Sequence, residues 1–188
     1  LRNTIDQLSE AGYVFIGMDH FAKPDNELSV AQREGRLHRN FQGYSTQAEC
    51  DLLAFGISSI GKVDDVYAQN VKTLDEYYAA IDQQQLPTLR GLRLTSDDIL
   101  RRELIGELMC QFQLDTNAFG VAHGIDFQAY FKEELSELEE LSLAGLMEWR
   151  DGTIVVPTKG RLLVRRVAMA FDAHLRHTKT EARYSKVV

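Results

Sequence analysis

The sequence predicts a mixed α/β chain in two parts: βα units over a parallel sheet in residues 1–90, then a mostly helical, winged-helix-like unit in residues 91–188. The nearly continuous apolar run Tyr13–Met18 fits a strand that is buried on both faces, as in a parallel sheet. Apolar runs then alternate with helical segments as far as Pro87, which is the rhythm of βα units. Beyond Pro87, large apolar residues recur at four-residue spacing, which is typical of helices that face a core. We place the boundary between Gln85 and Thr95.

The first part is predicted to run helix, strand, helix, irregular segment, strand, helix. Residues Leu1–Gly12 read as the end of a helix, and the turn residues Pro24–Asn26 precede a helix that stops near Gly35. The apolar segment Glu49–Gly61 is predicted to supply the second strand, and Val71–Gln85 the helix after it.

The second part is predicted to hold two helices, a hairpin and a last helix. Ser96 is expected to cap the first helix, and Thr158 the last. Asp151-Gly152 is a strong two-residue turn signal between two short strands. The apolar stripes of the first two helices are Leu100, Leu104, Leu108 and Phe112, and then Phe127, Phe131, Leu135, Leu138 and Leu141.

Charge argues against nucleic acid as a partner. The net charge of −7 disfavours nonspecific binding, which requires positive charge over the phosphates. Residues 157–188 hold eight Lys/Arg against two Asp/Glu, and a basic helix after a hairpin suits DNA reading. Residues 96–188, however, hold twelve Lys/Arg against fifteen Asp/Glu, a net charge of −3. We therefore favour pairing within the chain between the basic end and the acidic segment Lys132–Glu140.

Several features favour a cytoplasmic protein without membrane association. No apolar run approaches the ~18 residues that cross a bilayer, and no secretory signal stands at the front. Cys50 and Cys110 are far apart and lie in no CxxC spacing, so they form no zinc or iron–sulfur site by themselves. Because Leu1 opens on a helix already under way, we expect the chain to be part of a longer protein.

Reactive groups in βα architectures sit at the carboxyl ends of strands, which selects two segments. Asp19-His20 could be an acid/base pair or a ligand set for a metal, or a polar turn in which the Asp holds the His; we favour the turn. The segment "GISSIG", Gly56–Gly61, lacks the spacing of a phosphate loop. A glycine-lined turn that lets a flat ligand approach, with Ile60 as an apolar surface, is an equal alternative.

The run "HRNFQGYSTQ", His38–Gln47, has neither a strand nor a helix period and mixes a basic group, aromatics, amides and hydroxyls. Arg33, Arg36 and Arg39 lie at or just before it, and such a cluster suits a polyanionic ligand. The alternative, which is about equally favoured, is a solvated helix face that pairs with acids such as Glu34.

The stretch Gly17–Gln47 closely resembles the bacterial oxygen-independent coproporphyrinogen III oxidases, also called coproporphyrinogen dehydrogenases. The resemblance continues through "DLLAFGISSIG" and "YAQN" to "TKGRLLVRRVAMAFDAHLR" and "RYSKVV", and covers essentially the whole chain. These are radical S-adenosylmethionine enzymes, built on an incomplete (β/α) barrel with a helical C-terminal domain. The resemblance implies that this chain holds the last βα units of that barrel, followed by the winged-helix-like domain.

The resemblance also implies an activity. Members use S-adenosylmethionine and a four-iron four-sulfur cluster to decarboxylate two propionates of coproporphyrinogen III to vinyl groups, which gives protoporphyrinogen IX for haem synthesis. The CxxxCxxC motif that ligates the cluster is absent, so its ligands are expected upstream of Leu1, with no metal held by this chain. We therefore expect the chain alone to be inactive. We also expect the full-length protein to be monomeric.

Three residues match cofactor contacts of that family, all for S-adenosylmethionine. Ile60 matches an isoleucine that contacts the adenosyl group, and Phe41 and Gln42 match residues beside a second S-adenosylmethionine. Neither a catalytic residue nor the electron donor and acceptor follows from the sequence. The alternatives are a haem chaperone of the same superfamily and, less favoured, a winged-helix nucleic-acid-binding module.

Overall fold

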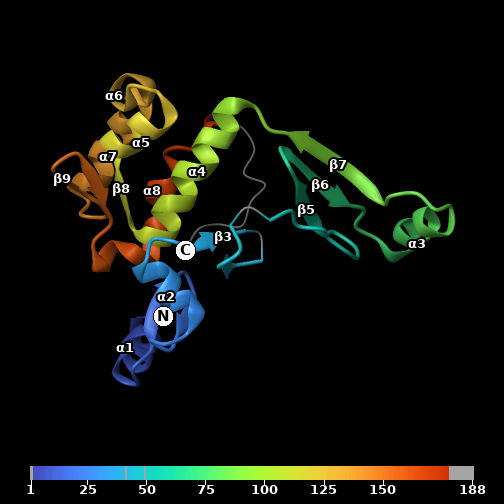
Figure 1. Ribbon diagram of the computed structural model, residues 1–188, viewed down its shortest axis with the longest axis horizontal. Coiled ribbons are helices and arrows are strands. Elements are labelled where there is room, and N and C mark those ends of the chain that lie inside the picture. The colour runs from blue at the N-terminus through green and yellow to red at the C-terminus, as the bar shows by residue number, and fades with distance from the viewer. Residues whose placement is uncertain (1, 41, 49, 178–188) are drawn as a thin grey trace. The chain divides into compact units, whose positions relative to one another are not determined.

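The computed structural model describes residues 2–40, 42–48 and 50–177 of this mixed α/β chain (Figure 1). The described residues form two compact units, one from residues up to 46 together with those from 100 on, and the other from residues 47–99. The predicted domain boundary between Gln85 and Thr95 stays a prediction. Phe41, one of the predicted cofactor contacts, lies outside the described residues.

The N-terminal segment has the predicted helix, strand and helix, with a second strand, β2, that the sequence analysis did not predict. Its elements are α1 (Arg2–Glu10), β1 (Val14–Gly17), β2 (His20–Ala22) and α2 (Glu27–Arg33). Helix α2 begins at the predicted turn because the Asn26 side chain accepts a hydrogen bond from the Leu28 amide, 3.0 Å away. It ends before Gly35, whose φ of +71° lies in the region that favours glycine.

The predicted parallel pairing within this chain is wrong. Every strand pairing in the described residues is antiparallel, including β1 with β2 and β3 (His38–Arg39) with β4 (Tyr44–Ser45). Two residues join β1 to β2, whereas a parallel crossover needs about a dozen or more. The apolar run Tyr13–Met18 does contain a strand, but its burial comes in part from packing against α2: Ile16 and Ala31 are fully buried in one small cluster.

The unit of residues 47–99 is a three-stranded antiparallel meander. It contains β5 (Ile60–Val63), β6 (Val66–Asn70), α3 (Leu74–Asp82) and β7 (Thr88–Arg93), in sheet order β5-β6-β7. Helix α3 lies beyond one end of this sheet rather than over its face (Figure 1). Pro87 and Leu94 are the only buried residues that the structure describes in this unit, so the unit buries little apolar surface of its own.

The predicted strand over Glu49–Gly61 is largely wrong. Only Ile60 and Gly61 of that segment belong to a named strand, and Leu52 adds an isolated bridge to Lys62. Ser58 adopts φ +60°, which breaks the extended conformation just before β5.

The C-terminal region contains a three-stranded antiparallel sheet, in the order β8-β10-β9, among helices. Its elements are α4 (Ser96–Gln111), β8 (Gln113–Asp115), α5 (Thr116–His123), α6 (Phe127–Tyr130), α7 (Lys132–Leu143), β9 (Glu148–Arg150), β10 (Thr153–Val155), the 3₁₀ helix η1 (Thr158–Leu163), α8 (Val164–Met169) and α9 (Ala173–His177). The predicted hairpin is confirmed, and Asp151 and Gly152 have the positive φ angles that its turn requires.

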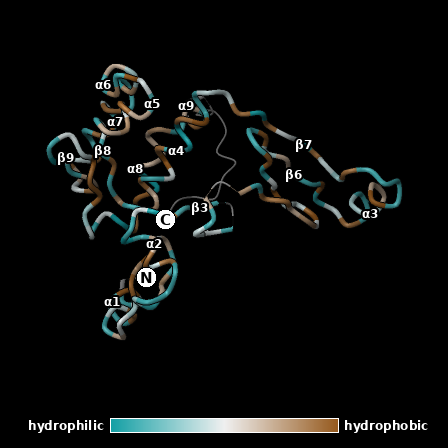
Figure 2. Tube along the Cα trace, viewed as in Figure 1, coloured by the Kyte–Doolittle hydropathy of each residue, from teal (hydrophilic) through white to brown (hydrophobic). Residues whose placement is uncertain are grey.

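The predicted apolar stripes form the core of this region. Polar and apolar residues alternate along α4 (Figure 2), and the predicted stripe Leu100, Leu104, Leu108 and Phe112 is buried. Phe112 itself follows the last residue of α4 and has φ +58°, so the stripe ends just beyond the helix. The second predicted helix is in fact two, α6 and α7, since Phe131 departs from helical geometry at φ −102° and ψ 27°. Its aromatic side chain is nevertheless fully buried and lies edge-on to Phe171, with ring centroids 5.4 Å apart.

Both predicted helix caps in this region need correction. Thr95, not Ser96, caps α4: its hydroxyl accepts from the Asp98 amide at 3.2 Å, and the Asp98 carboxylate accepts from the Thr95 amide at 2.9 Å. Thr158 opens the 3₁₀ helix η1 without capping it, because the preceding residue, Pro157, occupies the cap position and no side-chain hydrogen bond is made there. None of the helices in the described ranges is long and apolar enough to span a bilayer.

We expect Thr95→Ala to lower the free energy of unfolding by about 1 kcal/mol, because both hydrogen bonds of the Thr95 hydroxyl are lost. The matched control Ser96→Ala should stay within about 0.5 kcal/mol of the parent. Urea denaturation followed by far-ultraviolet circular dichroism measures both changes. A larger loss of unfolding free energy for Ser96→Ala than for Thr95→Ala would show that Ser96 caps the helix.

Candidate functional site

The turn between β1 and β2 places Asp19 and His20 side by side. His20 Nδ1 lies 2.7 Å from Asp19 Oδ1, so the carboxylate orients the imidazole ring. This is the polar turn that the sequence favoured, with the Asp holding the His. Among the residues that the structure describes, no group of three or more His, Cys, Asp or Glu side chains is arranged to hold a metal ion.

In the run that carries Gln42, the described residues 38–40 and 42–45 form a small hairpin, called the 38–45 hairpin below, through the pairing of β3 with β4. Inside it, the backbone amide of Asn40 donates to the Gly43 carbonyl oxygen at 2.9 Å, and the backbone amide of Gln42 donates to Asn40 Oδ1 at 2.8 Å. The backbone of Gln42 is therefore held while its side chain is exposed. An exposed amide can both donate and accept hydrogen bonds to a ligand.

Tyr44 anchors this hairpin and was not singled out from the sequence. Its hydroxyl donates to the Met109 carbonyl oxygen at 3.2 Å, near the end of α4, and its ring lies edge-on to His20 with centroids 5.2 Å apart. Burial is the main cause that raises the pKa of Tyr44 to about 12, and nearby Cys110 raises it further. The signal that could have found Tyr44 is weak: an aromatic residue in a polar run, beside a glycine.

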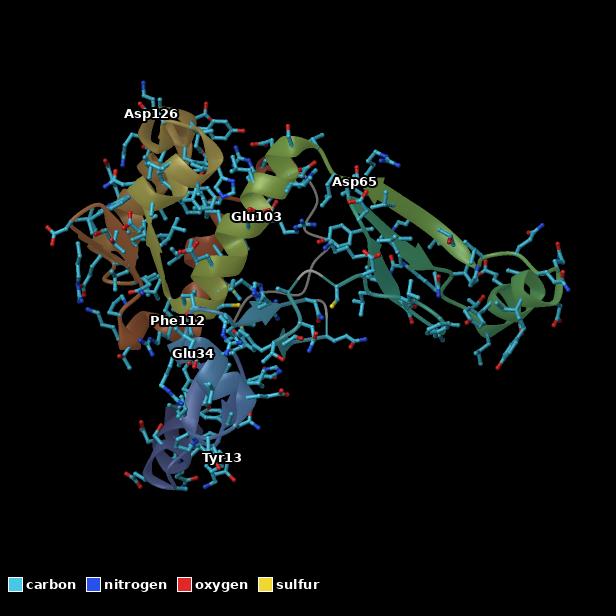
Figure 3. All side chains as sticks on the ribbon, in the orientation of Figure 1. Tyr13, Glu34, Asp65, Glu103, Phe112 and Asp126 are labelled. Atoms are coloured by element: carbon cyan, nitrogen blue, oxygen red, sulfur yellow. The ribbon has the colours of Figure 1, made fainter. Side chains whose placement is uncertain are left out.

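Gln32 is a second residue that sequence reasoning missed. Its side-chain amide donates to the carbonyl oxygens of Ile16, at 2.7 Å, and Cys110, at 3.1 Å. Helix α2 is thereby joined to both β1 and the end of α4. At the same junction, the Phe112 ring stacks on Phe15 with centroids 6.2 Å apart; Figure 3 labels Phe112 there, at the lower end of α4.

The three arginines of the predicted polyanion cluster have separate surroundings. Arg33 Nη1 donates to the Pro24 carbonyl oxygen at 2.8 Å, and Arg36 pairs with Glu34, as the solvated-face alternative expected. The Arg39 guanidinium lies over the Tyr44 ring, 5.6 Å from its centroid. Of the three, Arg39 is the one that belongs to the 38–45 hairpin, where it pairs with Tyr44.

Ile60 begins β5, where it pairs with Gln69 and is half-buried. The turn before it is held by hydrogen bonds within its own unit: the Gly56 amide donates to the Tyr77 hydroxyl at 3.2 Å, and the Ser58 amide donates to the Val71 carbonyl oxygen at 2.8 Å. Because these amides are engaged, the turn does not present them to a phosphate. Ile60 and Gln42 belong to different compact units.

A hollow beside α5 is lined with acids. It is formed by Glu103, Glu107, Asp115, Phe119 and His123, among others, and Figure 3 labels Glu103 on α4. Burial and then the neighbouring Asp115 raise the pKa of the Glu107 carboxyl. Three carboxyl groups make this hollow unfavourable for an anionic ligand.

The two free cysteines differ in accessibility. Cys110 is 1% exposed, and burial raises its pKa to about 12, whereas Cys50 is exposed. Since the thiolate is the nucleophile, we expect iodoacetamide at mildly alkaline pH to label Cys50 first and Cys110 only after unfolding. Mass spectrometry of tryptic peptides measures both reactions. Equal labelling in the native protein would show that the α2–α4 junction opens readily.

Comparisons with known proteins all point to one family. Residues 94–163 match the family model described as "HemN C-terminal domain". Curated proteins named oxygen-independent coproporphyrinogen III oxidase from Synechocystis sp., Salmonella typhimurium and Escherichia coli K12 are 47%, 49% and 47% identical. Each alignment covers all of this chain and 41% of the relative, so the chain spans less than half of those proteins.

A solved structure shows the same fold. It is described as coproporphyrinogen III oxidase (HemN) from Escherichia coli, a radical SAM enzyme, and it superposes with a TM-score of 0.87 at 48% sequence identity. The match covers 92% of this chain and 40% of the other.

Proposed function

We propose that this chain, which belongs to the oxygen-independent coproporphyrinogen III oxidase family as its C-terminal portion, works within an enzyme that converts coproporphyrinogen III to protoporphyrinogen IX. The observation that carries the proposal is the identity of 47% to 49% along the entire chain, together with the shared fold. Two propionate side chains would each lose carbon dioxide and two hydrogen equivalents and become vinyl groups in haem biosynthesis. The acceptor of the remaining electron is not identified by this chain.

When bound, S-adenosylmethionine and a four-iron four-sulfur cluster would supply the radical that takes a hydrogen atom from the substrate. The cluster does not fit the residues present, since Cys50 and Cys110 are single thiols and no group of three metal-ligating side chains occurs in the described ranges. It would be held by another part of the protein. We therefore expect the chain alone to leave S-adenosylmethionine intact under reducing conditions.

The residues of this chain fit a role in binding S-adenosylmethionine. Ile60 offers a half-buried apolar side chain at the start of β5, which suits the adenosyl group. Gln42 offers an exposed amide on a held backbone, and Phe41 precedes it in sequence. Arg39 is the proposed substrate-carboxylate contact best placed by the hairpin, and Arg33 and Arg36 would have to exchange their present partners.

We further propose that residues 1–90 complete an incomplete (β/α) barrel and that residues 91–188 form a winged-helix-like domain. Support for the first is the low burial of the 47–99 unit, whose apolar residues Leu74, Tyr78 and Ile81 are 44% to 58% exposed along one side of α3. The second is supported by the order α4, β8, α5, α7, β9, β10 and by a family model that begins at residue 94.

Two other functions are less well supported. A haem chaperone of the same superfamily would share the layout, but we do not expect it to carry the full run Asn40–Gln47. A nucleic-acid reader is disfavoured because α7, the helix before the hairpin, carries five glutamates and one lysine. The proposal also includes a monomeric, cytoplasmic protein without nucleic-acid or membrane partners.

The test uses the whole protein under strictly anaerobic conditions with reductant, S-adenosylmethionine and coproporphyrinogen III. We expect protoporphyrinogen IX to accumulate, with two carbon dioxide molecules for each porphyrinogen. Stoichiometric haem binding without turnover would replace the proposal with the chaperone. Salt-dependent binding to duplex DNA would favour the nucleic-acid module.

A further inference from the structure

We propose that His20 and Tyr44 are positioning residues that fix the 38–45 hairpin, and with it Gln42, through a reciprocal lock of two rings on two glycines. The ligand role of Gln42 rests on the proposed function, but the lock itself rests on geometry alone. Both rings, both glycines and the hairpin belong to one compact unit.

The first half of the lock is His20 against Gly43. A β-carbon at position 43 would lie 2.9 Å from His20 Nε2, closer than real β-carbons come to a neighbour. Gly43 is buried and has φ +142°, in the region that favours glycine. The imidazole therefore lies directly on the backbone that follows Gln42.

The second half is Tyr44 against Gly17. A β-carbon at position 17 would overlap the Tyr44 hydroxyl and lie 2.8 Å from its ring carbon Cζ. Gly17 is also buried, with φ +151°. Each hairpin thus inserts a ring where the other has a glycine, and the two rings meet edge-on at 5.2 Å.

Each ring is also held by a hydrogen bond to a residue outside the 38–45 hairpin. The Asp19 carboxylate holds His20 Nδ1 at 2.7 Å, and the Met109 carbonyl oxygen accepts from the Tyr44 hydroxyl at 3.2 Å. The second hydrogen bond reaches across 65 residues to the end of α4. The C-terminal region therefore holds the Tyr44 ring, and the β1–β2 turn holds the His20 ring.

The lock fixes the backbone of the hairpin, and so the point from which the exposed Gln42 side chain extends. A short two-residue ladder contributes little by itself, since an isolated two-stranded hairpin is marginal in water. Removal of either ring should leave the fold intact but let the hairpin move, and small displacements of a binding group are costly to a reaction.

The test measures hydrogen exchange of a peptide covering residues 38–47 in the whole protein, for His20→Ala, Tyr44→Ala and the parent. We expect exchange in both variants to rise by at least about tenfold, which corresponds to ~1.4 kcal/mol. Exchange in α7, which neither ring contacts through a hydrogen bond, should be unchanged. His20→Phe, which keeps a ring, should restore much of the protection. Parent-like exchange at 38–47 in both alanine variants would overturn the lock.

A double-variant comparison tests the reciprocity. Gly43→Ala should perturb the hairpin strongly in the parent and less in a His20→Ala background, because the imidazole that the new methyl meets is gone. The control is Gly12→Ala, which also has a positive φ, +79°, but no neighbour within 4 Å of its β-carbon. Its effect should be equal in both backgrounds. Equal effects of Gly43→Ala in both would show that only backbone strain matters.

A kinetic measurement tests whether the lock affects cofactor binding. In His20→Ala and Tyr44→Ala, the S-adenosylmethionine concentration for half-saturation should rise while iron content is unchanged. If the parent protein converts no coproporphyrinogen III, the proposed function fails but the exchange data still decide the lock. If the parent is active and exchange rises without any change in half-saturation, the lock stands and Gln42 is not a cofactor contact.

Discussion

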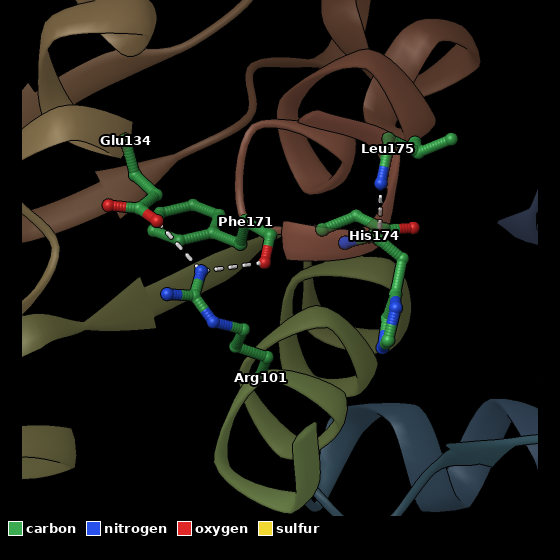
Figure 4. A network of polar contacts seen from close by, with 6 residues as sticks. Arg101, Glu134, Phe171, His174 and Leu175 are labelled. Carbon is green, nitrogen blue, oxygen red and sulfur yellow. Dashed lines mark hydrogen bonds and ion pairs between the residues drawn. The ribbon is translucent and has the colours of Figure 1, made fainter. Parts of the chain in front are cut away.

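Replacement of Glu134 by alanine is expected to lower the free energy of unfolding by about 3–5 kcal/mol, a large fraction of the ~5–15 kcal/mol of a typical domain. The Glu134 carboxylate lies 2.7 Å from Arg101 Nη1, and their side chains are only 4% and 14% exposed (Figure 4). Arg101 also donates to the Phe171 carbonyl oxygen at 3.0 Å, and its guanidinium lies over the Phe131 ring. Loss of the carboxylate would remove an anionic partner from this largely buried cation.

Two further variants separate the loss of the ion pair from the cost of keeping the Arg101 charge in a largely buried place. Arg101→Met with Glu134→Leu removes both charges and should recover most of the stability, because the buried pair itself contributes little net free energy. Glu148→Ala breaks an exposed pair with Arg150, at 2.8 Å, and should cost less than about 1 kcal/mol. Urea denaturation by circular dichroism measures all three. A loss for Glu134→Ala no greater than that for Glu148→Ala would mean that water reaches Arg101.

Ile60→Asp is expected to weaken S-adenosylmethionine binding and lower turnover by about 100-fold in the whole protein, since a carboxylate would replace the proposed apolar contact with the adenosyl group. The structure makes Ile60 half-buried at the start of β5, paired with Gln69. Isothermal titration with S-adenosylmethionine and anaerobic product formation measure the two effects. The content of iron and sulfide should not change, because the cluster would be held elsewhere.

The matched control for that change is Val63→Asp. It places the same charge on the same strand, at a side chain that is 48% exposed, and should leave cofactor affinity close to the parent value. Similar losses for both variants would indicate that charge anywhere on β5 disturbs the sheet. Parent-like affinity for Ile60→Asp would remove Ile60 from the cofactor site.

The elements that the sequence predicted correctly are those with local signals. Asn26 starts α2, and Asp151-Gly152 forms its turn, because each signal acts within a few residues. The stripe from Leu100 to Phe112 was also readable, since helical spacing alone defines its buried face.

The errors concern contacts between distant segments. A continuous apolar run such as Tyr13–Met18 indicates burial on both faces but not the direction of the neighbouring strand, which here arrives after two residues. Strand β7 (Thr88–Arg93) was missed because all six of its residues are exposed and carry no apolar period. The cap assigned to Ser96 was one residue off, which is within the usual uncertainty of a helix boundary.

Site residues could be predicted from the sequence where they belong to a known motif. Residues whose position depends on contacts between distant segments could not. Gln42 and Ile60 came from a resemblance and remain proposed contacts. Tyr44 and Gln32 were missed because their partners, Met109 and Cys110, are 65 and 78 residues away in sequence. The reciprocal lock likewise depends on a register between two hairpins that neither hairpin encodes by itself.

A chimera tests the proposed role of these 188 residues. They would replace the aligned segment of the Escherichia coli K12 oxidase, which is 47% identical over 188 residues. We expect the chimera to assemble the host iron–sulfur cluster and to form protoporphyrinogen IX at a rate comparable to the host, and Gln42→Ala in the same chimera to be slower. A folded chimera with full iron content that cleaves S-adenosylmethionine yet forms no protoporphyrinogen IX would contradict the proposed function.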